Sequence, residues 1–114
     1  MEISSYLKNE KMANPYGIDA CKLYDSELAE MIHISLPAGE SLVKHITPVD
    51  TIFYVLEGEA TIEIGEEQQN AEKDSLITSI KGIPHKISNR SDRILRFLVI
   101  KLPKPTSPPV IIEG

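Results

Sequence analysis

The sequence predicts an all-β protein, a sandwich or barrel built from short strands. The first observation is a series of short runs rich in β-branched and aromatic residues, separated by turn signals at regular spacing. The second is the lack of any convincing helical pattern longer than one turn, with residues 26–31 the nearest candidate. Together these features favour an antiparallel architecture over one in which strands alternate with helices.

The size and composition fit one globular domain. The chain has 114 residues, of which 41% are hydrophobic and 25% charged. Its formal net charge of −5, with scattered basic residues, argues against a nucleic-acid partner. No apolar run approaches the ~20 residues that cross a bilayer, so we expect no membrane partner. The absence of a visible secretory signal and the single cysteine, Cys21, predict a cytoplasmic protein with Cys21 as a small buried hydrophobe.

The chain divides into three predicted parts: an N-terminal arm at 1–18, a β-barrel at 19–102 and a proline-rich C-terminal strap at 103–114. The arm is dominated by polar residues and turn signals, and we expect it to be partly disordered or to lie across a neighbour. Four prolines between residues 103 and 109 end regular pairing. The strap is therefore expected to be extended, with residues 110–112 docking elsewhere.

The first strands of the barrel are predicted at 20–24, 28–36 and 42–47. The second ends at the Pro-Ala-Gly turn of residues 37–39, because proline removes a ladder donor and glycine permits a tight turn. In the third strand His45 and Thr47 share a face, because successive side chains alternate. His33 alternates with the apolar Ile32 and Ile34, which predicts a surface or interface histidine outside the barrel.

The later strands are predicted at 51–56, 60–64, 75–80, 84–88 and 93–102. Residues 65–69 are interpreted as a polar loop, and 57–59 as a tight hairpin. Residues 51–56 and 94–100 carry apolar side chains on both faces. One face must cover the core and the other needs its own chain or a partner, so we expect a homodimer.

Two stretches of this chain resemble the motifs of a known family. Residues 39–58 carry Gly39, His45 and Gly58 at the spacing of the first cupin motif, a glycine followed by His-x-His, a glutamate and a second glycine. Residues 74–89 resemble the partner motif, with His85 and Asn89 in place. The chain is similar to a small single-domain cupin. That resemblance implies a jelly-roll barrel, the double-stranded β-helix.

Both threonines of the first motif stand where the family has metal ligands. Thr47 replaces the second histidine and Thr51 the glutamate, and a threonine hydroxyl is a poor ligand for first-row divalent ions. The resemblance therefore leaves a weak two-histidine site, His45 and His85, for zinc, iron, manganese or nickel. A site without metal is also open. Asp50 would supply the missing carboxylate only through a bulge, because simple alternation turns it outward.

Three functions are compatible with this pattern. The first is binding of a small polar ligand in the barrel by His45, Thr47, Thr51 and His85. The second is a metal-dependent enzyme of the dioxygenase, isomerase or decarboxylase type, against which the missing carboxylate argues. The third is a dimeric structural or regulatory module with a vestigial site. The sequence has neither a nucleophile-elbow motif nor a glycine-rich phosphate loop, and it does not separate the first function from the third.

Overall fold

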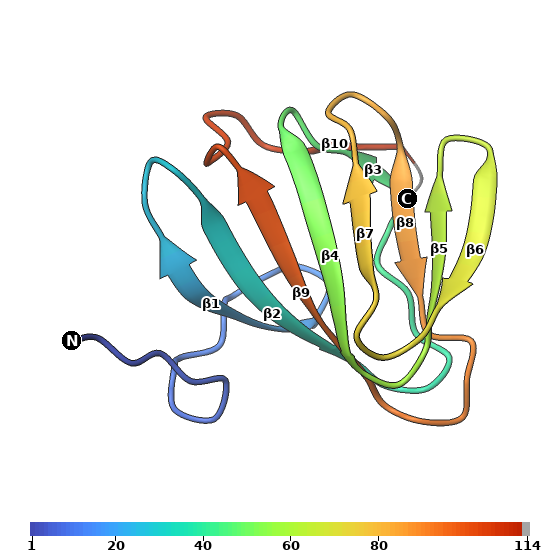
Figure 1. The fold of residues 1–114 in the computed structure, drawn as a ribbon, viewed down its shortest axis with the longest axis horizontal. Coiled ribbons are helices and arrows are strands. Elements are labelled where there is room, and N and C mark those ends of the chain that lie inside the picture. The colour runs from blue at the N-terminus through green and yellow to red at the C-terminus, as the bar shows by residue number, and fades with distance from the viewer. Residues whose placement is uncertain (113–114) are drawn as a thin grey trace.

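The computed structural model describes residues 1–112, and these form two five-stranded antiparallel sheets packed face to face (Figure 1). The first sheet has the order β1 (Asp19–Asp25), β2 (Glu30–Leu36), β9 (Leu95–Leu102), β4 (Asp50–Glu57) and β7 (Leu76–Ser79). The second has the order β10 (Val110–Ile111), β3 (His45–Ile46), β8 (His85–Ser88), β5 (Ala60–Ile64) and β6 (Glu67–Ala71). The predicted all-β jelly-roll barrel is confirmed.

The core lies between the two sheets and is organised in cross-strand rows. Strand alternation points every second side chain inward, and the register aligns these side chains across neighbouring strands. Three rows of the first sheet are apolar: Ile32, Val99, Phe53 and Ile77; then Ile34, Phe97 and Val55; then Leu36 and Leu95. The second sheet contributes Ala60, Ile62 and Ile87. Each fully buried aliphatic or aromatic side chain stabilises the fold by roughly 1.5–3 kcal/mol.

Two turns close the barrel at the end away from the candidate site. Gly58 has φ +84°, and a Cβ atom there would lie 2.4 Å from the carbonyl oxygen of Ile94, so only glycine fits the turn without strain. Asn89 is buried, and its Nδ2 donates to the carbonyls of Leu36 at 2.9 Å and Arg93 at 2.6 Å. These bonds tie the turn after β8 to the end of β2.

The N-terminal arm lies against the outer face of the first sheet, beside β1 and β2 (Figure 1). The Tyr6 ring stacks on His33 with centroids 3.9 Å apart, and its hydroxyl donates to Asp19 at 3.2 Å. His33 faces away from the core, as alternation predicts, but it is 1% exposed and accepts a hydrogen bond from Arg96 Nε. The prediction that His33 is a surface or interface residue is therefore wrong, because the chain's own N-terminal arm covers its side chain.

Two predicted elements differ from the observed ones. The polar loop expected at 65–69 overlaps β6 (Glu67–Ala71), an edge strand that pairs only with β5 and exposes most of its side chains. An exposed edge strand has no alternating hydrophobic side chains, so hydrophobic periodicity does not predict it. The strand expected at 42–47 is regular only at His45–Ile46, which pair with β8 on one side and with β10 on the other. No helix in the described part of the chain is long and apolar enough to cross a membrane.

Candidate functional site

A polar layer lies at one end of the barrel interior, directly beyond the apolar rows. In the first sheet the register aligns Glu30 with Lys101, Lys101 with Thr51, and Thr51 with Ser79. Each of these residues is two positions along its strand from a core residue, so its side chain points inward. The second sheet contributes the two predicted histidines, which are paired opposite each other on β3 and β8.

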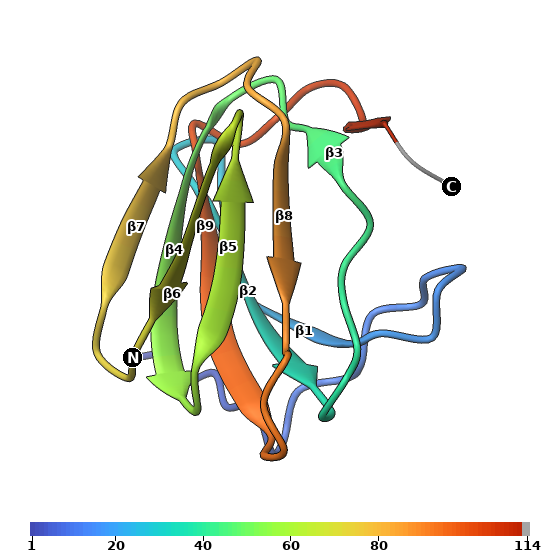
Figure 2. The same ribbon diagram turned by 90° about the vertical axis from the view of Figure 1, so that its right-hand side faces the viewer.

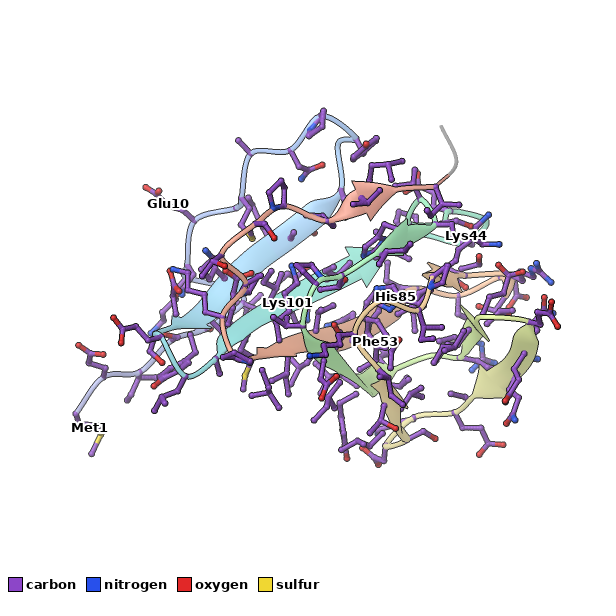
Figure 3. The ribbon with its side chains drawn as sticks, turned by 90° about the horizontal axis from the view of Figure 1, so that it is seen from above. Met1, Glu10, Lys44, Phe53, His85 and Lys101 are labelled. Carbon is purple, nitrogen blue, oxygen red and sulfur yellow. The ribbon has the colours of Figure 1, made fainter. Side chains whose placement is uncertain are left out.

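His45 and His85 meet inside this layer, as the family resemblance implied. Their Nε2 atoms are 3.1 Å apart, and the rings pack edge to face with centroids separated by 4.5 Å. His85 is only 2% exposed and packs edge to face on Phe53, the first aromatic residue of the apolar rows. Figure 3 shows His85, Phe53 and Lys101 in the middle of the molecule, between the strands, whereas Lys44 lies toward its rim.

The hydrogen-bond partners assign the tautomers of the two rings. The Val43 carbonyl can only accept, so His45 Nδ1 donates to it at 2.8 Å and His45 Nε2 is left as an acceptor. His85 Nε2 then donates to His45 Nε2, with Thr47 Oγ1 a second acceptor at 3.2 Å. His85 Nδ1 accepts from the Ser79 hydroxyl at 2.8 Å. Both imidazoles are therefore neutral within one connected network.

Burial keeps the two histidines neutral at physiological pH. It lowers the pKa of His85 to about 4, and the nearby His45 and the Lys101 ammonium act in the same direction. Burial also lowers the pKa of His45, which the hydrogen bond to Val43 partly opposes and the Lys101 charge reinforces. When a bound group breaks the contact between the rings, the pair offers it the lone pair of His45 Nε2 and the N–H of His85 Nε2, and no positive charge.

The donor set does not make a complete site for a divalent metal. The described residues hold no group of three or more histidine, cysteine or acidic side chains that could hold an ion. Two imidazole nitrogens face each other, but the groups beside them are the hydroxyls of Thr47 and Ser79, which are poor ligands for transition metals. Thr51 is buried and faces the same layer, yet it supplies no negative charge.

Asp50 does not supply the missing carboxylate. Its side chain points outward, as simple alternation predicts, and its Oδ1 accepts a hydrogen bond from the backbone amide of Lys81 at 2.9 Å. The bulge in this strand lies at its other end, between Val55 and Glu57, so it does not reorient Asp50.

A groove on the open side of the barrel leads to His45. Its volume is about 450 Å³, and it lies between the segment 40–45, residues 16–18 of the arm and the strap near β10. Figure 2 shows that segment and the strap at the edge of the second sheet, with the arm below them. The lining is mainly apolar, with Ile18, Leu42 and Val43, and His45 supplies its ring. Through the pair contact, His45 connects this groove to the buried His85.

Sequence reasoning missed three members of the polar layer. Lys101 continues the inward series of Leu95, Phe97 and Val99, so alternation alone would have placed it inside the barrel. Ser79 and Glu30 have weaker signals, because their positions depend on which strands become neighbours. Strand order is set by the fold, and one strand's sequence does not carry it.

Comparisons with known proteins agree with this architecture. A family model described as "Cupin domain" matches residues 32–101. An uncharacterized protein of Methanocaldococcus jannaschii is 29% identical over 85 residues, covering 74% of this chain and 73% of that protein. The solved structure of that same protein, a cupin with a double-stranded β-helix fold, has a TM-score of 0.78 at 24% identity, over 92% of this chain and 93% of that one. A polyketide cyclase from Streptomyces resistomycificus has a TM-score of 0.83 at 17% identity, over 100% and 87%.

Proposed function

Because the chain belongs to the cupin domain family, we propose that it binds a small polar organic ligand at the polar end of its barrel. His45, Thr47, Thr51 and His85 form the proposed binding site. The single observation that carries the proposal is the contact between two neutral histidines from different strands at the end of an apolar groove. Ligand sites are mostly apolar hollows with a few polar groups that fix orientation, and this groove has that composition.

The size of the groove and the state of His45 support this function. A volume of about 450 Å³ lies within the range of small-molecule sites, roughly 300–1,000 Å³. In the unliganded pair, His45 Nε2 is occupied by the N–H of His85. A ligand hydroxyl or amide entering the groove would compete for these two nitrogens, and it would satisfy the same hydrogen-bonding groups.

The test is a small-molecule thermal-shift screen followed by calorimetry on three variants. His45→Ala and His45→Ala/His85→Ala should lose binding of any hit, while far-UV circular dichroism stays unchanged. His33→Gln is the matched control, because it alters a buried histidine on the opposite face of the sheet and should keep binding. Hits that bind the double variant as tightly as the wild type would overturn the proposal.

A metal-dependent enzyme is the second candidate, favoured by the facing nitrogens of His45 and His85. The relative solved from Streptomyces resistomycificus is a polyketide cyclase, so the same fold does house catalysis elsewhere. The test is to purify the protein without a chelator or an affinity tag and to measure bound zinc, iron, manganese and nickel by mass spectrometry. Near-stoichiometric metal that disappears in the double variant would favour this candidate and make enzyme assays the next step.

A homodimer is the expected assembly for either function. The outer face of the first sheet carries Ile52 opposite Ile100 and Tyr54 opposite Leu98, all of them only half-buried. An apolar sheet face of this kind is stabilised by covering it. Light scattering at micromolar concentration should give twice the chain mass, and a monomeric mass would contradict the assignment. A cytoplasmic location fits the single cysteine, which is fully buried in β1.

A further inference from the structure

The polar layer also contains the Lys101 ammonium group, which is not among the residues of the proposed ligand site. Lys101 follows the inward series of β9, and its side chain is 17% exposed. Its Nζ lies 3.6 Å from Glu30 Oε1, while Lys22 Nζ lies 3.3 Å from the other oxygen of the same carboxylate. Glu30 is therefore shared by two ammonium groups, and its contact with Lys101 is the longer one.

The charges around Glu30 do not balance. Lys22 also reaches Asp25 at 3.5 Å, and Asp25 pairs with Lys104 at 2.7 Å. Three ammonium groups thus share two carboxylates, which leaves one positive charge without a partner within this network. On the other side of Lys101 are Thr51, which is uncharged, and the neutral histidine pair. A partly buried positive charge without a full counter-ion is costly, and an anionic ligand would remove that cost.

We infer that Lys101 is the counter-charge for an anionic group of the ligand, and that the site takes small monocarboxylic acids. This inference rests on the proposed ligand-binding function. The single excess charge matches one carboxylate better than a doubly charged phosphate. The carboxylate lies between Lys101 and the histidine pair, where the Lys101 ammonium and the Nε2–H of His85 donate to it. The apolar groove next to His45 holds the rest of the acid.

The test compares each acid with its uncharged amide by calorimetry at pH 7. Benzoate is paired with benzamide and hexanoate with hexanamide, so each pair differs in charge but hardly in shape. The wild type should bind the acid at least about tenfold more tightly than the amide, the usual scale of a charge-assisted hydrogen bond. Lys101→Met should remove this preference, and Lys101→Arg should keep it. Lys44→Met is the matched control, because it removes the same charge from an outward position and should keep the preference.

Glu30→Gln gives a second test in the opposite direction. This substitution removes the carboxylate that competes with the ligand for Lys101, so benzoate should bind more tightly to the variant than to the wild type. The loss of a contact with only a structural role would not increase the affinity for benzoate. Equal binding of acid and amide by the wild type, or an acid preference that survives in Lys101→Met, would overturn the inference and leave the ligand-binding function standing. If none of the probes binds the wild type, or if they bind His45→Ala/His85→Ala equally well, the inference about carboxylic acids and the proposed ligand-binding function are both overturned.

Discussion

Lowering the pH should destabilise this protein through His85. Burial lowers the pKa of His85 in the fold to about 4, from an ordinary value of 6.5. Between these values the unfolded chain binds a proton that the folded chain does not. The stabilisation from neutral His85 is therefore complete above pH 6.5 and is lost as the pH falls towards 4.

The size of the effect follows from the two pKa values of His85. Taken in full, a change from 6.5 to about 4 corresponds to a loss of about 3 kcal/mol of unfolding free energy by pH 4. At pH 4.5 the folded ring has only begun to bind its proton, so most of this change has already occurred. We therefore expect a loss of about 2–3 kcal/mol between pH 7 and 4.5.

The assay is urea denaturation at closely spaced pH values, with the wild type and His85→Gln measured in parallel. His33 has its pKa lowered by burial to about 4 as well, so it titrates in the same range. Because both proteins retain His33 and all carboxylates, the difference between the two curves reports His85 together with its hydrogen-bonded partner His45. Wild type and variant losing stability in parallel from pH 7 to 4.5 would refute the conclusion that burial holds His85 neutral.

Three further predictions concern the turns and the arm. Gly58→Ala should cost about 2 kcal/mol or more, because the new Cβ meets the carbonyl of Ile94 at positive φ; a melting temperature unchanged from wild type would contradict this. Asn89→Ala should cost about 2–4 kcal/mol in urea denaturation, since two buried carbonyls lose their donor. Tyr6→Ala should uncover His33 and raise its pKa towards 6.5 in an NMR titration, and an unmoved titration curve would show that the arm does not bury that ring.

The meeting of His45 and His85 was implied by the resemblance of the two stretches to the cupin motifs, and the structure pairs the two residues on β3 and β8. Alternation also turned Asp50 outward and His33 away from the core, in agreement with the structure. Which residues of the polar layer become neighbours could not be derived from the sequence. Lys101 and Glu30 meet because β9 lies between β2 and β4, and that order depends on packing between strands far apart in the chain.

The sequence predicted neither the strand order nor the solvent exposure of individual side chains on the outer face of the first sheet. His33 has the alternation of a surface residue, and only the fold of the arm covers it with Tyr6. The arm is dominated by polar residues, so its pattern did not predict contact with the sheet. Its docking combines the stacked Tyr6 ring, the Tyr6–Asp19 hydrogen bond and a Lys11–Asp19 ion pair of 2.8 Å. Met12 also packs against the core, and its backbone amide donates to the Ala20 carbonyl at 2.7 Å.

Because the polar layer is separate from the apolar rows, its side chains can be replaced without changing the residues that hold the two sheets together. Thr47 and Thr51 are small and buried, and neither belongs to the rows that hold the sheets together. Thr47 contacts His85, and Thr51 is the register partner of Ser79, which also contacts His85. Thr47→His and Thr51→Glu would supply a third nitrogen and a carboxylate, at a cost of about 1–3 kcal/mol for each enlarged side chain. The doubly substituted chain should therefore bind zinc where the wild type does not, with the apolar rows of the framework unchanged.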